Sequence, residues 1–125
     1  MITFSRSEQR IYYQGKDWEC RSDFFAVSNG GQDHHETLPD GRYVCTAEEP
    51  PAENNAQYGT FYITTGDPRG RDIHGGGSDL PDPLAPRQGW EKTYGCCRMQ
   101  NEDGEELSRM IIAAGNGVSL SVTEA

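Results

Sequence analysis

The chain has 125 residues, a hydrophobic fraction of 34% and a formal net charge of −9 from 11 basic and 20 acidic side chains. This length predicts a single domain over residues 1–125 that buries one modest core. Nucleic acid is not an expected partner, because phosphate binding needs clustered Lys and Arg, which the sequence lacks. No apolar run of about 18 residues is present to span a membrane, and the 15 Gly and 7 Pro favour short strands joined by turns.

Alternation of apolar and polar residues predicts strands along most of the chain. Ile2 and Phe4, and then Ile11 and Tyr13, would face inward from two strands that flank a polar turn. Residues 15–17 are typical of a second turn, and the Pro-rich segment 46–57 is typical of a surface loop. Further strand candidates are residues 18–21, 24–28, 43–45, 59–65, 71–74 and 118–122.

One strong helix signal lies in the C-terminal half. Leu107, Met110, Ile111 and Ala114 recur at helical spacing, which predicts a helix over about residues 101–114. Asn101 or Asp103 would cap it, with Glu102, Glu105 and Glu106 in its first turn. We therefore predict a mainly β fold, a sandwich or barrel of mostly antiparallel strands with one principal helix.

Residues 71–101 carry the groups that cysteine acyl transfer requires. A thiol nucleophile needs a base to deprotonate it, and His74 is the one histidine near Cys96 in this segment. Backbone N–H groups around Gly95 and Cys96 would bind an oxyanion, and Gly75 would let the backbone approach a substrate closely. No G-x-S-x-G element follows His74, so a serine hydrolase is not indicated.

Two motifs in this segment, IHGG and TYGCCRMQNED, resemble the active-site signature of the L,D-transpeptidase catalytic domain, or YkuD domain. That pattern is a strand ending in Ile-His-Gly, a loop, and then Ser/Thr-x-Gly-Cys, an apolar residue and Arg-Met-x-Asn-x-Asp. The matching residues are Thr93, Gly95, Cys96, Arg98, Met99, Asn101 and Asp103. Tyr94 replaces a common His or Lys, Cys97 replaces a common Ile or Val, and the intervening loop is slightly long. These departures bear on substrate preference.

The resemblance implies an L,D-transpeptidase-like fold and a cysteine acyltransferase that acts on tetrapeptide stems of peptidoglycan. Cys96 would attack the carbonyl of the third residue, a diamino acid such as diaminopimelate, and expel the terminal D-alanine. The thioester would then pass to a second stem in a 3–3 cross-link, to a free D-amino acid in exchange, or to water in L,D-carboxypeptidase trimming. This chemistry requires no cofactor and no metal.

Other residues of the segment are expected to bind substrate. Arg98 would hold a substrate carboxylate or orient the loop, since its planar fork suits either partner. Tyr94 and Thr93 would line the approach to the thiol. Trp90 would either pack beneath the loop at residues 76–92 or line the groove, and the loop itself would form a groove wall.

The expected place of action is the periplasm or cell wall. The N-terminus lacks an apolar h-region, so we expect either export without a signal peptide or a mature domain separated from its leader. A bare catalytic domain resembles secreted antibacterial effectors, including those of type VI secretion, and an immunity protein or a secretion-apparatus component would then be a further partner. The alternatives are a non-catalytic acidic binding domain that keeps the fold, and a cysteine hydrolase of amidase type.

The remaining cysteines and histidines leave several alternatives open. Cys20 and Cys45 would form a disulfide in an oxidising compartment, Cys96 and Cys97 would form a vicinal disulfide, or all four thiols would stay reduced. No CxxC pair is present, so we do not expect a structural zinc site. His34 and His35 are best explained as an exposed loop pair, because adjacent histidines on a strand point to opposite faces.

Overall fold

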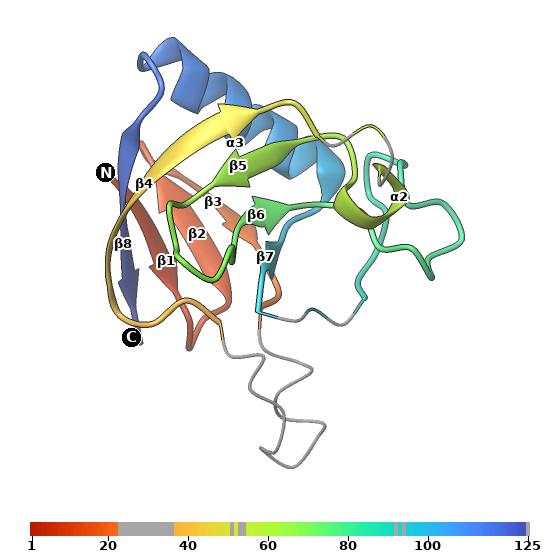
Figure 1. Cartoon of the computed structure of the whole chain (residues 1–125), viewed down its shortest axis with the longest axis horizontal. Helices are drawn as coiled ribbons and strands as arrows, with labels where there is room; N and C mark the ends of the chain where they lie inside the picture. The colour runs from red at the N-terminus through yellow and green to blue at the C-terminus, as the bar shows by residue number, and fades with distance from the viewer. Residues whose placement is uncertain (23–36, 51, 53–54, 92, 94, 125) are drawn as a thin grey trace.

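Eight short strands form one curled sheet in the order β3-β2-β1-β8-β4-β5-β6-β7 (Figure 1). The structure is a computed structural model that describes residues 1–22, 37–50, 52, 55–91, 93 and 95–124. The strands are β1 (Ile2–Ser5), β2 (Arg10–Tyr13), β3 (Lys16–Glu19), β4 (Gly41–Glu48), β5 (Tyr62–Thr64), β6 (Ile73–His74), β7 (Cys97–Arg98) and β8 (Val118–Thr123). The helices among these described residues are α2 (Asn55–Tyr58) and α3 (Asn101–Ala113).

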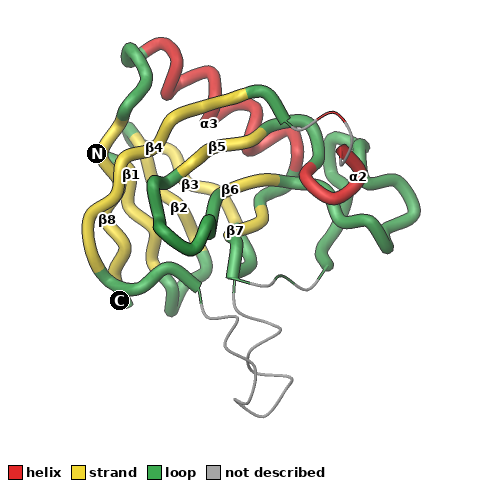
Figure 2. The backbone as a smooth tube through the Cα atoms, in the orientation of Figure 1, coloured by secondary structure: helices red, strands yellow, loops and turns green. Residues whose placement is uncertain are grey.

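The pairing of the strands confirms the predicted mainly β class. Five of the seven pairings are antiparallel, and the two parallel ones join β1 to β8 and β6 to β7. Figure 2 shows the strands curling as a half-barrel and α3 lying along the sheet. The strand expected at residues 24–28 and the expected loop pair His34 and His35 lie outside the described residues.

The core is formed by the apolar residues that alternate along the strands, as predicted. Ile2 lies opposite Leu120, while Phe4 lies between Ile11 and Val122. The same face continues through the far end of the sheet, where Ile63, Ile73 and Cys97 occupy neighbouring strands. These residues are all almost fully buried. Because side chains alternate along a strand, the residues between them in β5, β6 and β7 face the other side of the sheet.

Several strand boundaries differ from the sequence predictions. β5 and β6 are shorter than the expected residues 59–65 and 71–74, and the boundaries of β3 and β4 also move. The turn before β3 is Gln14-Gly15, both with positive φ, so the strand starts at Lys16 rather than at residue 18. Paired positive φ values are typical of the tight hairpin turns that suit strand twist. β4 extends to Glu48 because Thr46, Ala47 and Glu48 pair with β5, so the expected loop is shorter.

Helix α3 confirms the predicted helix, and its N-terminus corrects the expected cap. The N-cap residue is Gln100, which makes no side-chain capping hydrogen bond, and the first-turn acids are Glu102 and Asp103. The expected caps, Asn101 and Asp103, both lie inside the helix. Negative charge in the first turn is nevertheless favourable to the helix dipole.

The packing of α3 depends on a glycine. Gly104 lies on the buried face with Asn101, Leu107 and Ile111. A Cβ at Gly104 would lie 1.9 Å from Cζ of Phe61, so only glycine lets the ring approach the helix this closely. On the opposite side, Glu106 accepts hydrogen bonds from Trp18 Nε1 at 2.9 Å and from Lys16, which ties α3 to β3. Neither helix in the described part of the chain is long and apolar enough to cross a bilayer.

Candidate active site

The candidate site lies on the face of β5, β6 and β7 opposite the core. Tyr62 is the register partner of His74, and His74 is the register partner of Arg98, so these three side chains form one row across three strands. Asp72 and Cys96 lie two residues before His74 and Arg98. Cys97 N donates to Asp72 O at 2.9 Å, and this bond brings Cys96 level with Asp72. Alternation then places Asp72 and Cys96 on the same face as the row.

His74 is held as a neutral base. It ends β6, as predicted, and is 2% exposed. Its Nδ1 lies 2.8 Å from Gly75 O, and a carbonyl can only accept, so Nδ1 carries the proton and Nε2 keeps its lone pair. Burial lowers the pKa of His74 to about 4, with Arg98 acting in the same direction and the Gly75 bond opposing it. At neutral pH the imidazole is therefore uncharged.

Two tyrosine rings surround the imidazole. The Tyr62 ring lies parallel to it, with an interplanar angle of 3° and centroids 5.9 Å apart. The Tyr58 ring meets it edge-on at 5.0 Å and meets Tyr62 edge-on at 5.3 Å. These contacts fix the plane of the imidazole. Neither tyrosine was identified by the sequence analysis, because the register that brings them to His74 is not visible in the sequence.

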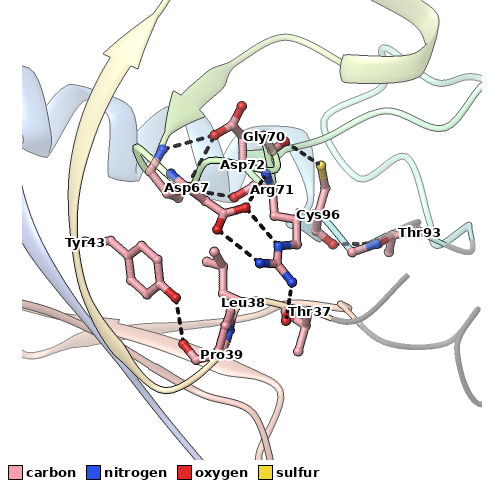
Figure 3. Close-up of polar contacts among 12 residues, drawn as sticks. Thr37, Leu38, Pro39, Tyr43, Asp67, Gly70, Arg71, Asp72, Thr93 and Cys96 are labelled. Atoms are coloured by element: carbon pink, nitrogen blue, oxygen red, sulfur yellow. Dashed lines mark hydrogen bonds and ion pairs between the residues drawn. The ribbon is translucent and has the colours of Figure 1, made fainter. Parts of the chain in front are cut away.

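Cys96 is half-buried and its thiol is protonated at rest. Sγ donates a long hydrogen bond, 3.8 Å, to Gly70 O in the turn before β6 (Figure 3). Burial raises the pKa of the thiol, and the Asp72 and Asp67 carboxylates raise it further, while the Asp72 N–H and Arg98 oppose them. Activation of Cys96 therefore depends on a base rather than on a preformed thiolate.

His74 ends β6, and Cys96 immediately precedes β7, the parallel neighbour of β6. With strands about 4.8 Å apart and a rise of about 3.3 Å per residue, an offset of two residues puts their Cα atoms roughly 8 Å apart. That separation suits two facing side chains with or without a bridging water. Tyr62 stacks on His74, and Cys96 lies near enough to contribute to the raised pKa of Tyr62, after burial and the bond to Asp72.

The turn before Cys96 is braced from within. Thr93 is buried, accepts a hydrogen bond from Gly95 N at 3.0 Å and donates one to Cys96 O at 2.6 Å, both through Oγ1. Gly95 has a φ of +111°, which side-chain-bearing residues rarely adopt. Thr93 thus shapes the turn, and its expected place in lining the approach stays a prediction. Tyr94 lies outside the described residues.

Arg98 contacts the loop rather than solvent. Its buried guanidinium donates to Glu91 O at 3.3 Å and to Gln57 O at 3.4 Å, and lies 3.7 Å from the Glu91 carboxylate. These contacts hold Arg98 against Glu91 of the loop and Gln57 of α2, and its two expected roles, holding a substrate carboxylate or orienting the loop, stay predictions. Trp90 is half-buried beneath the Arg21 guanidinium, which lies 4.6 Å from the centre of the indole ring.

The absence of a side chain at Gly75 is required by close packing, and no open space lies beside it. Its N–H donates to Tyr58 O at 2.9 Å, and a Cβ there would lie 2.1 Å from Asn101 Oδ1. Asn101 is fully buried, accepts from Thr60 N at 3.2 Å and donates to Pro83 O and Ala85 O at 2.9 and 2.8 Å. The asparagine of the motif therefore anchors the neighbouring loops.

The long loop before Cys96 is anchored to the start of α3. Gln88 donates to Met99 O at 2.8 Å and accepts from Asn101 N at 2.6 Å. Gln100 both donates to Gly89 O and accepts from Gly89 N, each at 3.0 Å. These two glutamines, which the sequence analysis missed, fix this part of the loop beside the site.

All four cysteines are free thiols. Cys20, Cys45 and Cys97 are buried, and Cys20 contacts Cys97 rather than pairing with Cys45 as one alternative had it. Burial, followed by the neighbouring Cys20 thiol, raises the pKa of Cys97 well above its ordinary value. Within the described ranges, no cluster of three His, Cys, Asp or Glu side chains is placed to bind a metal.

No protein-family model and no curated protein matches the sequence. A solved structure, that of the Bdellovibrio bacteriovorus protein Bd1075, has a similar fold with a TM-score of 0.60 and 15% sequence identity. The similarity covers 99% of this chain and 47% of that one, so this chain spans about half of the Bd1075 chain. At this identity the similarity extends to the fold alone.

Proposed function

We propose that the chain is a cysteine acyltransferase of the L,D-transpeptidase type, which transfers or hydrolyses tetrapeptide stems of peptidoglycan through a thioester on Cys96. One observation carries the proposal: a neutral histidine with a free Nε2 lone pair ends β6 on the same face as a half-buried thiol that immediately precedes β7, the parallel neighbour of β6. The IHGG and TYGCCRMQNED motifs supply the resemblance, and these motifs contribute both groups.

In the proposed first half-reaction, His74 Nε2 takes the thiol proton as Sγ forms a bond to the carbonyl carbon of the third stem residue. Both groups are uncharged at rest, so proton transfer accompanies attack rather than preceding it. The resulting oxyanion is stabilised by backbone N–H groups. Because the Gly95 N–H is bonded to Thr93 Oγ1, its expected oxyanion role requires that bond to be exchanged for the substrate oxygen.

Collapse of the tetrahedral intermediate breaks the carbon–nitrogen bond, and His74 returns the proton to the departing amine of D-alanine. In the second half-reaction an amine or water attacks the thioester, again with His74 as base. A stem amine gives a cross-link, a D-amino acid gives exchange, and water gives trimming. Loop residues held by Arg98, Gln88 and Gln100 would form the wall beside the stem.

The test is a product analysis of purified muropeptides. Chromatography with mass spectrometry should show loss of terminal D-alanine from tetrapeptide stems, with cross-linked, exchanged or tripeptide products. Cys96→Ala and His74→Gln should each abolish the change, and Cys97→Ala should retain it. Cleavage of the bond between the sugar and the peptide would instead identify an amidase, and unchanged muropeptides would refute acyl transfer.

A second candidate is a non-catalytic binding domain of the same fold. It is favoured by the thiol's contact with Gly70 O rather than with His74 and by its raised pKa. Under this alternative Cys96→Ala would bind isolated peptidoglycan as well as the wild-type chain and would leave it chemically unchanged. Wild-type turnover that is lost in Cys96→Ala would reject it.

We propose the periplasm or cell wall as the place of action, because the stem peptides are there, and an antibacterial effector as the biological role. The test is directed expression in a Gram-negative host. Export of the wild-type chain to the periplasm should inhibit growth, whereas cytoplasmic expression or exported Cys96→Ala should not. Growth that is unaffected by the exported, folded wild-type chain would contradict the effector role.

A further inference from the structure

Tyr62, which stacks on the candidate base, is itself held at its other end. Its Oη donates to Asp72 Oδ2 at 2.7 Å. The second carboxylate oxygen, Oδ1, accepts from Thr65 N at 3.1 Å and lies 3.5 Å from Thr65 Oγ1. Asp72 is 9% exposed, and burial, followed by its bond to Asp72, raises the pKa of Tyr62. The phenol therefore stays protonated and keeps donating.

The position of Asp72 links the two reacting groups. It lies two residues before His74, on the same face, and its backbone carbonyl accepts from Cys97 N at 2.9 Å. A chain of contacts thus runs from Asp72 through the Tyr62 hydroxyl and ring to the face of His74. Side chains that orient a functional group are commonly fixed by further hydrogen bonds of this kind.

We infer that Tyr62 and Asp72 are a positioning pair for His74, in which the carboxylate fixes the phenol and the phenol ring fixes the plane of the imidazole beside Cys96. This inference rests on His74 acting as the base of the proposed function. A sub-ångström placement of the base matters because a displacement of about 1 Å from productive geometry can lower a rate about 100-fold. The alternative is a purely structural role, in which the hydrogen bond between Tyr62 and Asp72 only stabilises the pairing of β5 with β6.

Asp72 has a second effect because it lies level with Cys96, where its carboxylate charge raises the pKa of the thiol. The charged and titratable groups around Cys96 include Asp72 and Asp67 before β6, Arg98 and Cys97 on β7, and Tyr62 on β5. Asp67 forms an ion pair with Arg71, in which Arg71 Nε lies 2.8 Å from Asp67 Oδ2 (Figure 3). The bonds to Asp72 described above come from neutral donors, so its negative charge disfavours the thiolate and keeps the proton on sulfur until His74 removes it.

Three substitutions separate these effects. Tyr62→Leu removes the ring face, and Tyr62→Phe removes only the hydroxyl. Asp72→Asn keeps the shape and a hydrogen-bonding partner for Tyr62 but removes the charge. The matched control is Tyr12→Phe, because the exposed Tyr12 side chain of β2 donates to the Glu8 carboxylate, away from the site.

Two readouts do not require turnover. Nitrogen-15 NMR of the folded protein should show a single Nδ1–H tautomer for His74 in the wild type and Tyr12→Phe, and a mixture of tautomers in Tyr62→Leu. The rate of Cys96 alkylation by iodoacetamide, followed against pH, should move to lower pH in Asp72→Asn and stay in place in Tyr12→Phe. The label is expected on Cys96 because the other three thiols are buried, and peptide mapping checks this assignment.

Turnover of muropeptides provides the third readout. Tyr62→Leu should lower kcat roughly 100-fold with KM little changed, and Tyr62→Phe should lower it less, because its ring still stacks. If wild-type turnover is absent while the NMR and alkylation effects are present, the proposed function fails and the positioning pair stands. If Tyr62→Phe and Asp72→Asn fold and match Tyr12→Phe in tautomer, alkylation profile and kcat, the positioning pair is refuted, whether or not Tyr62→Leu folds.

Discussion

Replacement of Gly104 by alanine tests how closely α3 approaches β5. In an ordinary helix Gly→Ala stabilises by about 1 kcal/mol. Here the new Cβ would lie 1.9, 2.0 and 2.3 Å from Cζ, Cε1 and Cε2 of Phe61, a ring that is 3% exposed and also packs against Gly75. Ordinary carbon contacts are about 3.5 Å or more, so the ring must move by more than about 1 Å. Overpacking of this degree costs about 3 kcal/mol, the upper part of the usual range.

The expected net effect of Gly104→Ala is therefore a loss of about 2 kcal/mol in the free energy of unfolding. Phe61→Leu supplies the control, because leucine lacks the three ring atoms that clash. In that background the clash is absent, so Gly104→Ala should stabilise by up to about 1 kcal/mol. Urea unfolding of the four proteins, followed by circular dichroism, measures both effects. A stabilising Gly104→Ala in the wild-type background, or the same sign in both, would refute this packing.

Three further predictions follow from the site. Burial lowers the pKa of His74 from 6.5 to about 4, so between these pH values the unfolded chain binds more protons than the folded one and stability falls as pH falls. Relative to His74→Gln, the free energy of unfolding of the wild type, measured in urea, should drop by about 2 kcal/mol between about pH 7.5 and about pH 5. Parallel pH profiles of the two proteins would contradict a buried neutral imidazole. Cys97→Ala should cost about 1 kcal/mol of stability through a small cavity and leave alkylation of Cys96 intact, whereas an unlabelled Cys97→Ala would show that the motif register is wrong. Trp90→Ala should raise KM more than it lowers kcat if the loop forms a groove wall, and an unchanged KM would make the loop a spacer.

Sequence patterns predicted the regular elements because their periodicity is local. Alternation at Ile2 and Phe4 and helical spacing at Leu107 and Ile111 correspond to β1 and α3. The strand that ends at His74 also followed from the motif. Turn chemistry was predicted less well, since the paired positive φ values that start β3 two residues early depend on the hairpin geometry.

The contacts around the site could not be predicted because they depend on register between strands. Tyr62 and Asp72 flank His74 only once β5 pairs with β6, and no local pattern gives that register. Asn101 was expected to cap α3 but instead bonds to loop carbonyls, because the loop returns across the start of the helix. An isolated glycine inside a helical pattern, as at Gly104, was a signal of close packing that the sequence analysis did not use.

Acyl transfer on Cys96 is tested most directly by capture of the acyl-enzyme. The wild-type chain is mixed with a purified tetrapeptide muropeptide, quenched in acid, digested and mapped by mass spectrometry. We expect a tripeptide-stem thioester on the peptide that contains Cys96 and free D-alanine in solution, and neither product with Cys96→Ala or His74→Gln. An adduct on a different cysteine, or no adduct and intact tetrapeptide from a folded wild-type chain, would contradict acyl transfer on Cys96.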